Sequence, residues 1–183
     1  MRSLATFIDR VDPDVLALCE IDAGDALALA TRFARQWAYR GSQAIIWKPQ
    51  LHQARVRDAY LPRTPLRPLE RRGLLRVATQ LGESPLELVA TQIAAEREQC
   101  VRDLRYLRSS LRRIRSQCLL LAVLPDSKIG VRDIGFQKLI AGTDHEAIFS
   151  RGLQVLESAP DAYYHRGIGR PLLARVRLTA GSL

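Results

Sequence analysis

The chain has 183 residues, of which 47% are hydrophobic and 26% charged, and its formal net charge is +9 at pH 7. This composition excludes an intrinsically disordered chain, and the length predicts a single globular domain over residues 1–183. The basic excess favours anionic partners such as nucleic acid, but a coding bias that writes Arg for Lys is an equal explanation, because Lys occurs at only three positions.

The first quarter of the chain predicts a helix and a strand, followed by a second helix and a second strand. Apolar residues at helical spacing indicate a helix over 2–10, which an Asp-Pro-Asp turn ends. The run 15–21 is apolar apart from Glu20 near its end, so we expect a strand that is buried on both faces and presents a carboxylate where α/β sheets place their chemistry. An amphipathic helix over 26–37 and a short buried strand over 43–47 follow.

The middle of the chain changes character twice. Residues 48–72 are rich in Arg and contain four prolines, so we expect an irregular excursion with room for one short edge strand, because Pro cannot donate to a sheet. Two strand-like runs, 73–81 and 85–93, are separated by Gly-Glu-Ser and predict a β-hairpin. Residues 96–114 then give the clearest helical pattern in the sequence.

The helix expected over 96–114 carries two stripes. The apolar stripe, which should face the core, consists of Val101, Leu104, Leu107, Leu111 and Ile114. The basic stripe, on an adjoining face, consists of Arg102, Arg105, Arg108 and Arg112. The basic stripe has two interpretations: a surface that follows the phosphates of a nucleic acid, or a solvated face whose Arg stems cover the edge of the core.

The C-terminal third predicts strands separated by connectors. A fully apolar run over 117–124 predicts a buried strand, and 130–136 a connector. Further strands are expected over 146–154 and 171–178. Strands at intervals, a few helices and a central hairpin together predict a mixed α/β sandwich.

The cysteines and the apolar segments bear on the cellular compartment. The three cysteines, Cys19, Cys100 and Cys118, are too few and too widely spaced for a zinc motif, and two of them lie in apolar runs where a reduced thiol acts as a small hydrophobe. No run approaches the ~18 apolar residues of a membrane span, and the first residues do not form a secretory signal. We therefore expect a cytoplasmic protein without a membrane span.

Several segments together resemble the endonuclease/exonuclease/phosphatase superfamily, the DNase I-like Mg²⁺-dependent phosphoesterases. The residues that carry the resemblance are DPDVLALCEI at 12–21, YRGSQAIIW at 39–47, LELVATQIAAEREQCVRDLRYL at 86–107, CLLLAVL at 118–124, Asp144-His145 with FSRGL at 149–153, and RPLLARVRL at 170–178. The resemblance covers nearly the whole chain and implies an α/β fold, a DNase I-like sandwich of two mixed β-sheets flanked by helices. It also implies a site at the rim where the strand ends of both sheets meet.

Within that family pattern, one metal-site residue can be matched. Glu20 stands where the family has its metal-ligand Glu. The family's first strand, with its metal-site Asn, would precede Met1, so the fold is expected to lack that strand. Glu20 also has a second interpretation, as a strand-end carboxylate paired with a nearby Arg.

The other chemical positions of the family carry different residues here. Thr91-Gln92 stands in place of a strand-end Thr-His, and Ala-Val-Leu-Pro at 122–125 in place of Gly-Asp-x-Asn. Gly-Ile-Gly at 167–169 stands in place of Ser-Asp-His, while Asp144-His145 matches a different family segment. Because Val and Ile can neither ligate Mg²⁺ nor accept a proton, the resemblance implies a degenerate member of the family.

These departures predict a non-catalytic phosphoesterase-like domain that acts as a structural, regulatory or binding subunit of a larger assembly. No catalytic residue and no cofactor is expected, and a protein partner is expected, whose strand could complete the open sheet edge. Two alternatives stay open. One is a Mg²⁺-dependent phosphodiesterase or nuclease that would use Mg²⁺ at Glu20, and the other is a basic nucleic-acid-binding module built on the arginine stripe.

Overall fold

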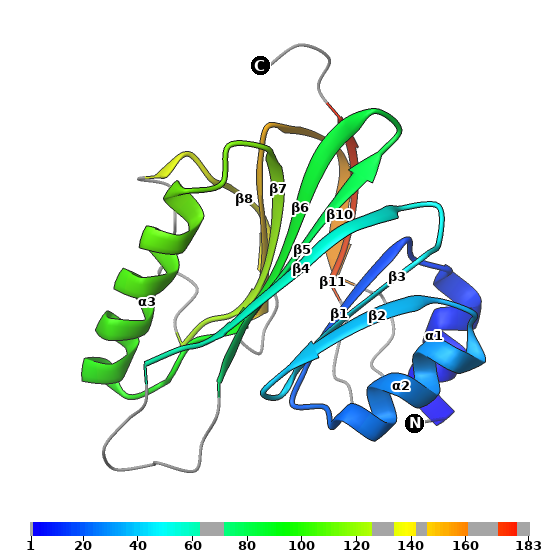
Figure 1. The fold of residues 1–183 in the computed structure, drawn as a ribbon, viewed down its shortest axis with the longest axis horizontal. Helices are drawn as coiled ribbons and strands as arrows, with labels where there is room; N and C mark the ends of the chain where they lie inside the picture. The colour runs from blue at the N-terminus through cyan, green and yellow to red at the C-terminus, as the bar shows by residue number, and fades with distance from the viewer. Residues whose placement is uncertain (1, 63–71, 126–133, 142–145, 161–171, 179–183) are drawn as a thin grey trace.

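The computed structural model describes residues 2–62, 72–125, 134–141, 146–160 and 172–178, which form four layers (Figure 1). Two helices cover one side of a layer of short sheets, and a six-stranded sheet packs against the other side of that layer. A third helix covers the far face of the six-stranded sheet. The predicted sandwich of β-sheets flanked by helices is confirmed. None of the helices in the described ranges is long and apolar enough to cross a membrane.

The described part of the chain contains three helices and eleven strands. They are α1 (Arg2–Val11), β1 (Val15–Cys19), α2 (Ala23–Arg32), β2 (Gln36–Arg40), β3 (Gln43–Trp47), β4 (His52–Tyr60), β5 (Gly73–Leu81), β6 (Ser84–Gln92), α3 (Arg97–Arg112), β7 (Gln117–Val123), β8 (Gln137–Ala141), β9 (Glu146–Arg151), β10 (Leu153–Pro160) and β11 (Leu172–Leu178). The six-stranded sheet has the order β4-β5-β6-β7-β9-β8 and is mixed, because α3 connects β6 to a parallel β7. The short sheets, β1-β3-β2 and β10-β11, are antiparallel.

Ion pairs fix the turn that leads from α1 into β1. The Lys48 ammonium lies 2.8 Å from a carboxylate oxygen of Asp12 and 3.0 Å from one of Asp14. Arg35 donates to the backbone carbonyl of Pro13. The hydrogen bond from Lys48 holds the pKa of Asp12 below its ordinary value. The Asp-Pro-Asp sequence therefore forms the predicted turn, which is held by Lys48, just after β3, and by Arg35, just after α2.

The second helix is shorter than predicted, and a strand follows it that the sequence did not reveal. α2 ends at Arg32 and β2 begins at Gln36, so Trp37 lies in a strand and the helix predicted over 26–37 is wrong at its end. β2 pairs antiparallel with β3, and the indole Nε1 of Trp47 donates to Gln36 Oε1 at 2.8 Å. Since an apolar residue at Trp37 suits a helix as well as a strand, cross-strand pairing decides between them.

β4 is a full edge strand and not the short one expected within 48–72. It spans nine residues and pairs with β5 along its length. Pro49 and Pro62 lie outside β4, so neither removes a donor from the ladder. The other two prolines of this stretch lie outside the described residues. The backbone N–H of Leu61 donates to the carbonyl of Arg72 at 2.9 Å, so the residue that follows β4 lies beside the residue that precedes β5.

The later strands are confirmed in part. The predicted hairpin is β5 and β6, and the apolar run 117–124 is β7. The strand predicted over 146–154 is instead two strands, because Gly152, with a φ of 69°, separates β9 in the six-stranded sheet from β10, which pairs with β11. β8 was not predicted, since its five residues, QKLIA, are too few to show a period. Residues 130–133 of the expected connector lie outside the described residues.

α3 covers the six-stranded sheet with a face that is offset from the predicted apolar stripe. Leu107 and Leu111 are buried as predicted, but Val101 is 52% exposed. Cys100 and Asp103 take the places on the buried side instead. The offset arises because Asp103 binds polar groups between the helix and the sheet.

Asp103 is completely buried and forms the centre of a polar network. Its carboxylate pairs with the guanidinium of Arg72, which is also buried, and accepts hydrogen bonds from the Ala94 N–H at 3.1 Å and from Gln99 Nε2 at 2.8 Å. Gln99 Nε2 also donates to the carbonyl of Pro62 at 2.7 Å. One acid of α3 thus ties the helix to the end of β4, the start of β5 and the segment that follows β6.

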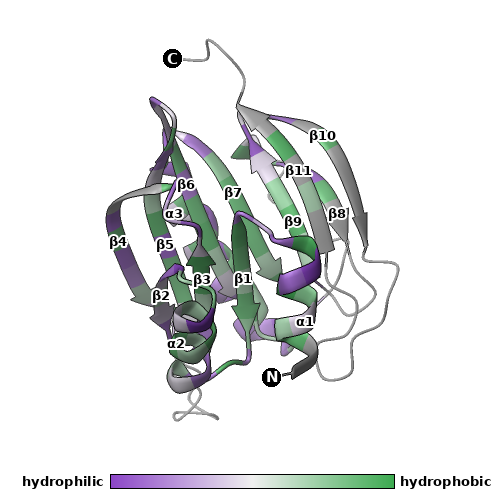
Figure 2. Cartoon of the chain, turned by 90° about the vertical axis from the view of Figure 1, so that its right-hand side faces the viewer, coloured by the Kyte–Doolittle hydropathy of each residue, from purple (hydrophilic) through white to green (hydrophobic). Residues whose placement is uncertain are grey.

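β1 is half-buried along its length and not buried on both faces as predicted, because it is an edge strand. Val15 and Ala17 face the six-stranded sheet, whereas Leu16 and Leu18 face the helices. Figure 2 shows β1 and the β10–β11 pair on the same side of the six-stranded sheet. In the described part of the chain, no strand pairs with the outer edge of β1.

Replacing Asp103 with Ala should lower the free energy of unfolding by about 3–5 kcal/mol, because the charge of Arg72 would remain buried without its carboxylate. Asp9→Ala is the matched control. Asp9 also lies on a helix and pairs with an arginine, Arg32, but the pair is exposed and 3.6 Å apart, so its loss should cost only about 0–1 kcal/mol. Urea denaturation of both variants measures the difference, and equal costs would contradict the assignment.

Candidate functional site

The ends of several strands meet at one rim of the sandwich. β6 and β7 run parallel and end side by side, with Gln92 opposite Val123, and β9 begins beside them with Glu146 opposite Val123. β1 ends at the same rim, so Glu20, which directly follows it, comes close to Gln92. The structure therefore places the predicted metal-site residue where the strand ends of both layers meet.

Glu20 is exposed and has an amide as its partner. Its carboxylate Oε1 accepts a hydrogen bond from Gln92 Nε2 at 2.9 Å, and its backbone adopts a φ of 57°. The positive φ lets the chain turn sharply between β1 and Ile21, whose N–H donates to the carbonyl of Ser42 at 3.2 Å. Within the described residues the partner of Glu20 is thus a glutamine, where the sequence suggested an arginine.

Cys19, the last residue of β1, directly precedes Glu20 in the chain. Burial first, and then the negative charges of Glu20 and Glu146, raise the pKa of the Cys19 thiol to about 12. Burial likewise raises the pKa of Cys118 to about 12 and that of Cys100 above its ordinary value. At neutral pH these thiols are protonated, and Cys19 cannot serve as a thiolate nucleophile at the rim.

A junction between the two sheet layers holds the rim in place. Gln43 at the start of β3 is completely buried, and its Oε1 accepts the N–H of Gly73 at 2.6 Å. The hydroxyl of Thr91 donates to the carbonyl of Gly73 at 3.0 Å. A Cβ atom at Gly73 would lie 2.4 Å from the carbonyl oxygen of Arg40, so only glycine permits this approach. The junction fixes β3, and with it the neighbouring β1, over the end of β6.

In the part of the rim that the structure describes, few side chains could ligate the Mg²⁺ ion that the resemblance implies. Mg²⁺ demands nearly octahedral oxygen ligation. Here Gln92 presents its amide donor to Glu20, and Val123 offers no oxygen from its side chain. Among the described residues no group of three or more His, Cys, Asp or Glu side chains could hold a metal ion. Asp144, His145 and the segment 167–169 lie outside the described residues.

Three of the four arginines of the predicted basic stripe line one groove on α3. Arg105, Arg108 and Arg112 line a groove of about 650 Å³ along the helix, together with Arg113, which the sequence analysis did not include. Arg102 is exposed but does not line the groove. α3 covers the face of the six-stranded sheet opposite to β1, so the arginines and Glu20 do not form one site.

Two polar contacts that shape this part of the molecule were not predicted from the sequence. Glu20 and Gln92 are 72 positions apart, and the resemblance placed both at the family's site without indicating that they pair. The buried pair of Arg72 and Asp103 had a clearer signal. Asp103 falls three positions after Cys100 and four before Leu107, within a buried helical stripe, and an acid at such a position requires a buried partner.

Comparisons with known proteins support the fold. No protein-family model matches the chain, and no curated protein matches it in sequence. Solved structures do match it. A functionally unknown conserved protein from Enterococcus faecalis V583 has a TM-score of 0.79 and 15% identity, over 97% of this chain and 90% of that one. TDP2 from D. rerio, complexed with a single-strand DNA product, has a TM-score of 0.78 and 12% identity, over 96% and 90%.

A third match is an endonuclease/exonuclease/phosphatase family protein from Bacteroides thetaiotaomicron, with a TM-score of 0.77 and 10% identity over 96% of this chain and 88% of that one. The resemblance read from the sequence is therefore confirmed at the level of the fold: the chain has the DNase I-like fold of the endonuclease/exonuclease/phosphatase superfamily. Likeness at these identities concerns the fold alone.

Replacing Glu20 with Gln should speed alkylation of Cys19, because it removes a negative charge that raises the pKa of the thiol while keeping an oxygen acceptor for Gln92. The gain should be at most about tenfold at a fixed, mildly alkaline pH, the effect of one pKa unit on the thiolate fraction. Iodoacetamide labelling followed by peptide mass spectrometry measures each cysteine. Cys118 is the internal control, and equal acceleration there would indicate general opening of the fold.

Proposed function

We propose that this chain is a phosphoesterase-like domain that does not hydrolyse phosphoesters and works by binding, as a subunit of a larger assembly. The observation that carries the proposal is the pairing of Glu20 with the Gln92 amide at a rim whose neighbouring strand ends in Val123. The chain has a fold that phosphoesterases also have, but at its rim the carboxylate of Glu20 is bound by the amide of Gln92.

Hydrolysis of a phosphoester needs a group that neutralises the charge developing on phosphate oxygens and a base for the attacking water. At the described part of the rim, the carboxylate of Glu20 is engaged, the Val123 side chain is apolar, and Leu124 packs into the core under α3. The thiol of Cys19 is protonated at neutral pH and cannot replace a base. Loss of such groups lowers the rate of hydrolysis by many orders of magnitude.

The binding surface that we propose is the outer edge of β1. The N–H of Lys48 donates to the carbonyl of Asp14, so Asp14 faces β3 across the ladder. Because the hydrogen-bonding direction alternates along an antiparallel strand, Leu16 also faces β3, whereas the N–H and carbonyl of Ala17 point outward. An outward row of donors and acceptors is a template for another strand.

Apolar side chains around this edge favour a protein strand as its partner. Val15 and Ala17 of β1, Leu119 of β7 and Val176 of β11 are all only partly buried beside the same core. β7 is a central strand, yet Leu119 and Leu121 on its inner side are half-exposed while Leu120 on its other side is buried. An extended segment with apolar residues on one face would cover these side chains and pair with β1 by main-chain hydrogen bonds.

The purified chain should release no product from a phosphodiester, a phosphomonoester or single-stranded DNA in the presence of Mg²⁺ or Mn²⁺, beyond what Glu20→Ala releases. Colorimetric assays with p-nitrophenyl esters and gel assays with labelled DNA measure this directly. Metal-dependent turnover that disappears in Glu20→Ala would overturn the proposal and would assign the chain to the hydrolytic alternative.

In the isolated protein the amide of Ala17 should exchange with solvent much faster than that of Leu16, because its N–H points away from β3. In the complex purified from native cells, Ala17 should become protected. Ala17→Pro removes the outward N–H and should release the partner, while Ala17→Val keeps the N–H and should retain it. Slow exchange at Ala17 without a partner, or equal retention by both variants, would contradict strand addition.

A further inference from the structure

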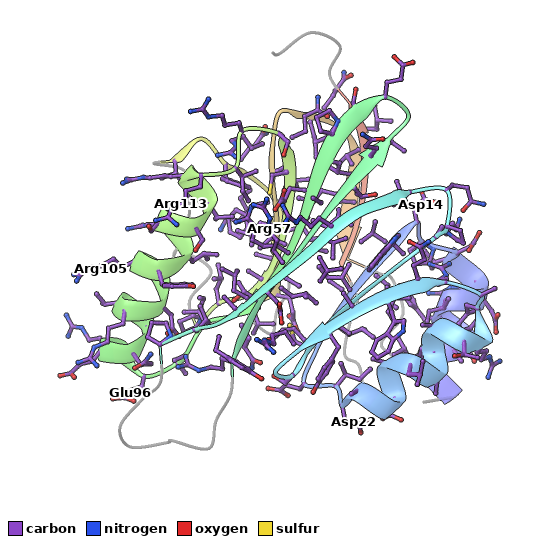
Figure 3. All side chains as sticks on the ribbon, viewed as in Figure 1. Asp14, Asp22, Arg57, Glu96, Arg105 and Arg113 are labelled. Carbon is purple, nitrogen blue, oxygen red and sulfur yellow. The ribbon has the colours of Figure 1, made fainter. Side chains whose placement is uncertain are left out.

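The groove on α3 is a second surface that the proposed function does not use. Its lining, among the described residues, comes from one face of the helix: Val101, Leu104, Arg105, Arg108, Ser109, Arg112 and Arg113. The lining includes four arginines and no acid. Figure 3 labels Arg105 and Arg113 on α3 and shows Arg105 projecting away from the six-stranded sheet. The groove is therefore an accessible, strongly positive surface.

Three of the four groove arginines, Arg105, Arg112 and Arg113, have no carboxylate partner among the described residues. No Asp or Glu lies three or four positions from Arg105 or Arg112 along α3. Arg108 instead lies three positions after Arg105 and four before Arg112, on the same helix face. Like charges at such spacings destabilise a helix. The acid nearest in sequence, Asp103, is buried with Arg72.

Helix electrostatics account for only part of this arrangement. Cations in the last turn are favoured by the negative end of the helix dipole, which explains Arg112 and Arg113. Arg105 lies two turns earlier and gains nothing from that end. Arg102, outside the groove, has Glu98 four positions before it, the favourable order for a surface pair. The arginines of the groove thus differ from the ordinary solvated arginine on the same helix.

We infer that the groove binds the phosphate backbone of a single-stranded nucleic acid. Arg105 and Arg112 are seven residues apart, about 10 Å along the helix, which is long enough for two successive phosphates of one strand to lie against them. Guanidinium groups bind phosphates through paired hydrogen bonds, and the hydroxyl of Ser109 adds a donor between them.

The shape of the site favours a single strand over a membrane surface. The groove runs along one helix face, so it admits a narrow chain. A membrane surface requires a broad apolar face with aromatic residues, but the apolar face of α3 is buried against the sheet and Val101 is the exposed large hydrophobic residue of the groove lining. Binding of this kind weakens with salt, because each phosphate contact releases counterions.

The test compares two double variants of one helix. Arg105→Gln/Arg112→Gln changes the groove, and Arg97→Gln/Arg102→Gln changes two exposed arginines of α3 outside it. Both remove two charges, and Gln keeps helix propensity close to that of Arg. Fluorescence anisotropy with a labelled mixed-sequence single-stranded DNA, over a series of salt concentrations, gives the affinity and its salt slope.

The control variant should bind like the unchanged protein. The groove variant should lose affinity, and the slope of log K against log salt should become shallower by about 1.4, since each phosphate contact on a single strand contributes about 0.7. Equal losses in both variants would show that net charge alone drives binding and would overturn the inference. So would absence of DNA binding, or stronger binding of the groove to anionic vesicles or to a polyglutamate peptide in the same assay.

Discussion

The close contact between the two sheet layers at Gly73 is the constraint on which the rest of the rim depends. Gln43 and Thr91 bind the N–H and the carbonyl of this one residue from opposite layers, and there is no room for a side chain. Because these contacts join the start of β3 to the end of β6, they also set where β1 ends. The contact of Glu20 with Gln92 is a result of that position. These contacts involve neither Glu20 nor Gln92, so the shape of the rim does not depend on the chemistry of those two residues.

Much of the fold could be predicted because local signals agreed with the tertiary structure. The Asp-Pro-Asp turn, the hairpin around Gly82 and the apolar strand β7 each carry turn chemistry or periodicity that admits one interpretation. The errors arose where the pattern served two structures. Trp37 suits a helix or a strand, and only its pairing with β3 decides. Gly152 looks like an ordinary residue of one long strand, but it marks the point where the chain passes from one layer to the other.

The site was less predictable than the fold. Glu20 could be located from the sequence because it ends an apolar strand, but its partner depends on the relative position of two layers, and no local pattern encodes that position. The α3 arginines illustrate a smaller error of the same kind. The spacing of the apolar residues predicted that Val101 faces the core. In the structure the buried carboxylate of Asp103 faces Arg72, and Val101 is exposed. The groove therefore includes Arg113 and leaves out Arg102.

The hydrogen bond from Leu61 to Arg72 has an evolutionary consequence. It brings the two ends of the intervening stretch together at the base of β4 and β5, and the buried pair of Arg72 and Asp103 anchors that base to α3. Because closing a longer loop costs only about 0.6 kcal/mol for each doubling of its length, residues can be inserted or removed between these two positions at little cost to the sheet. Insertions and deletions between Leu61 and Arg72 are therefore compatible with the pairing of β4 and β5.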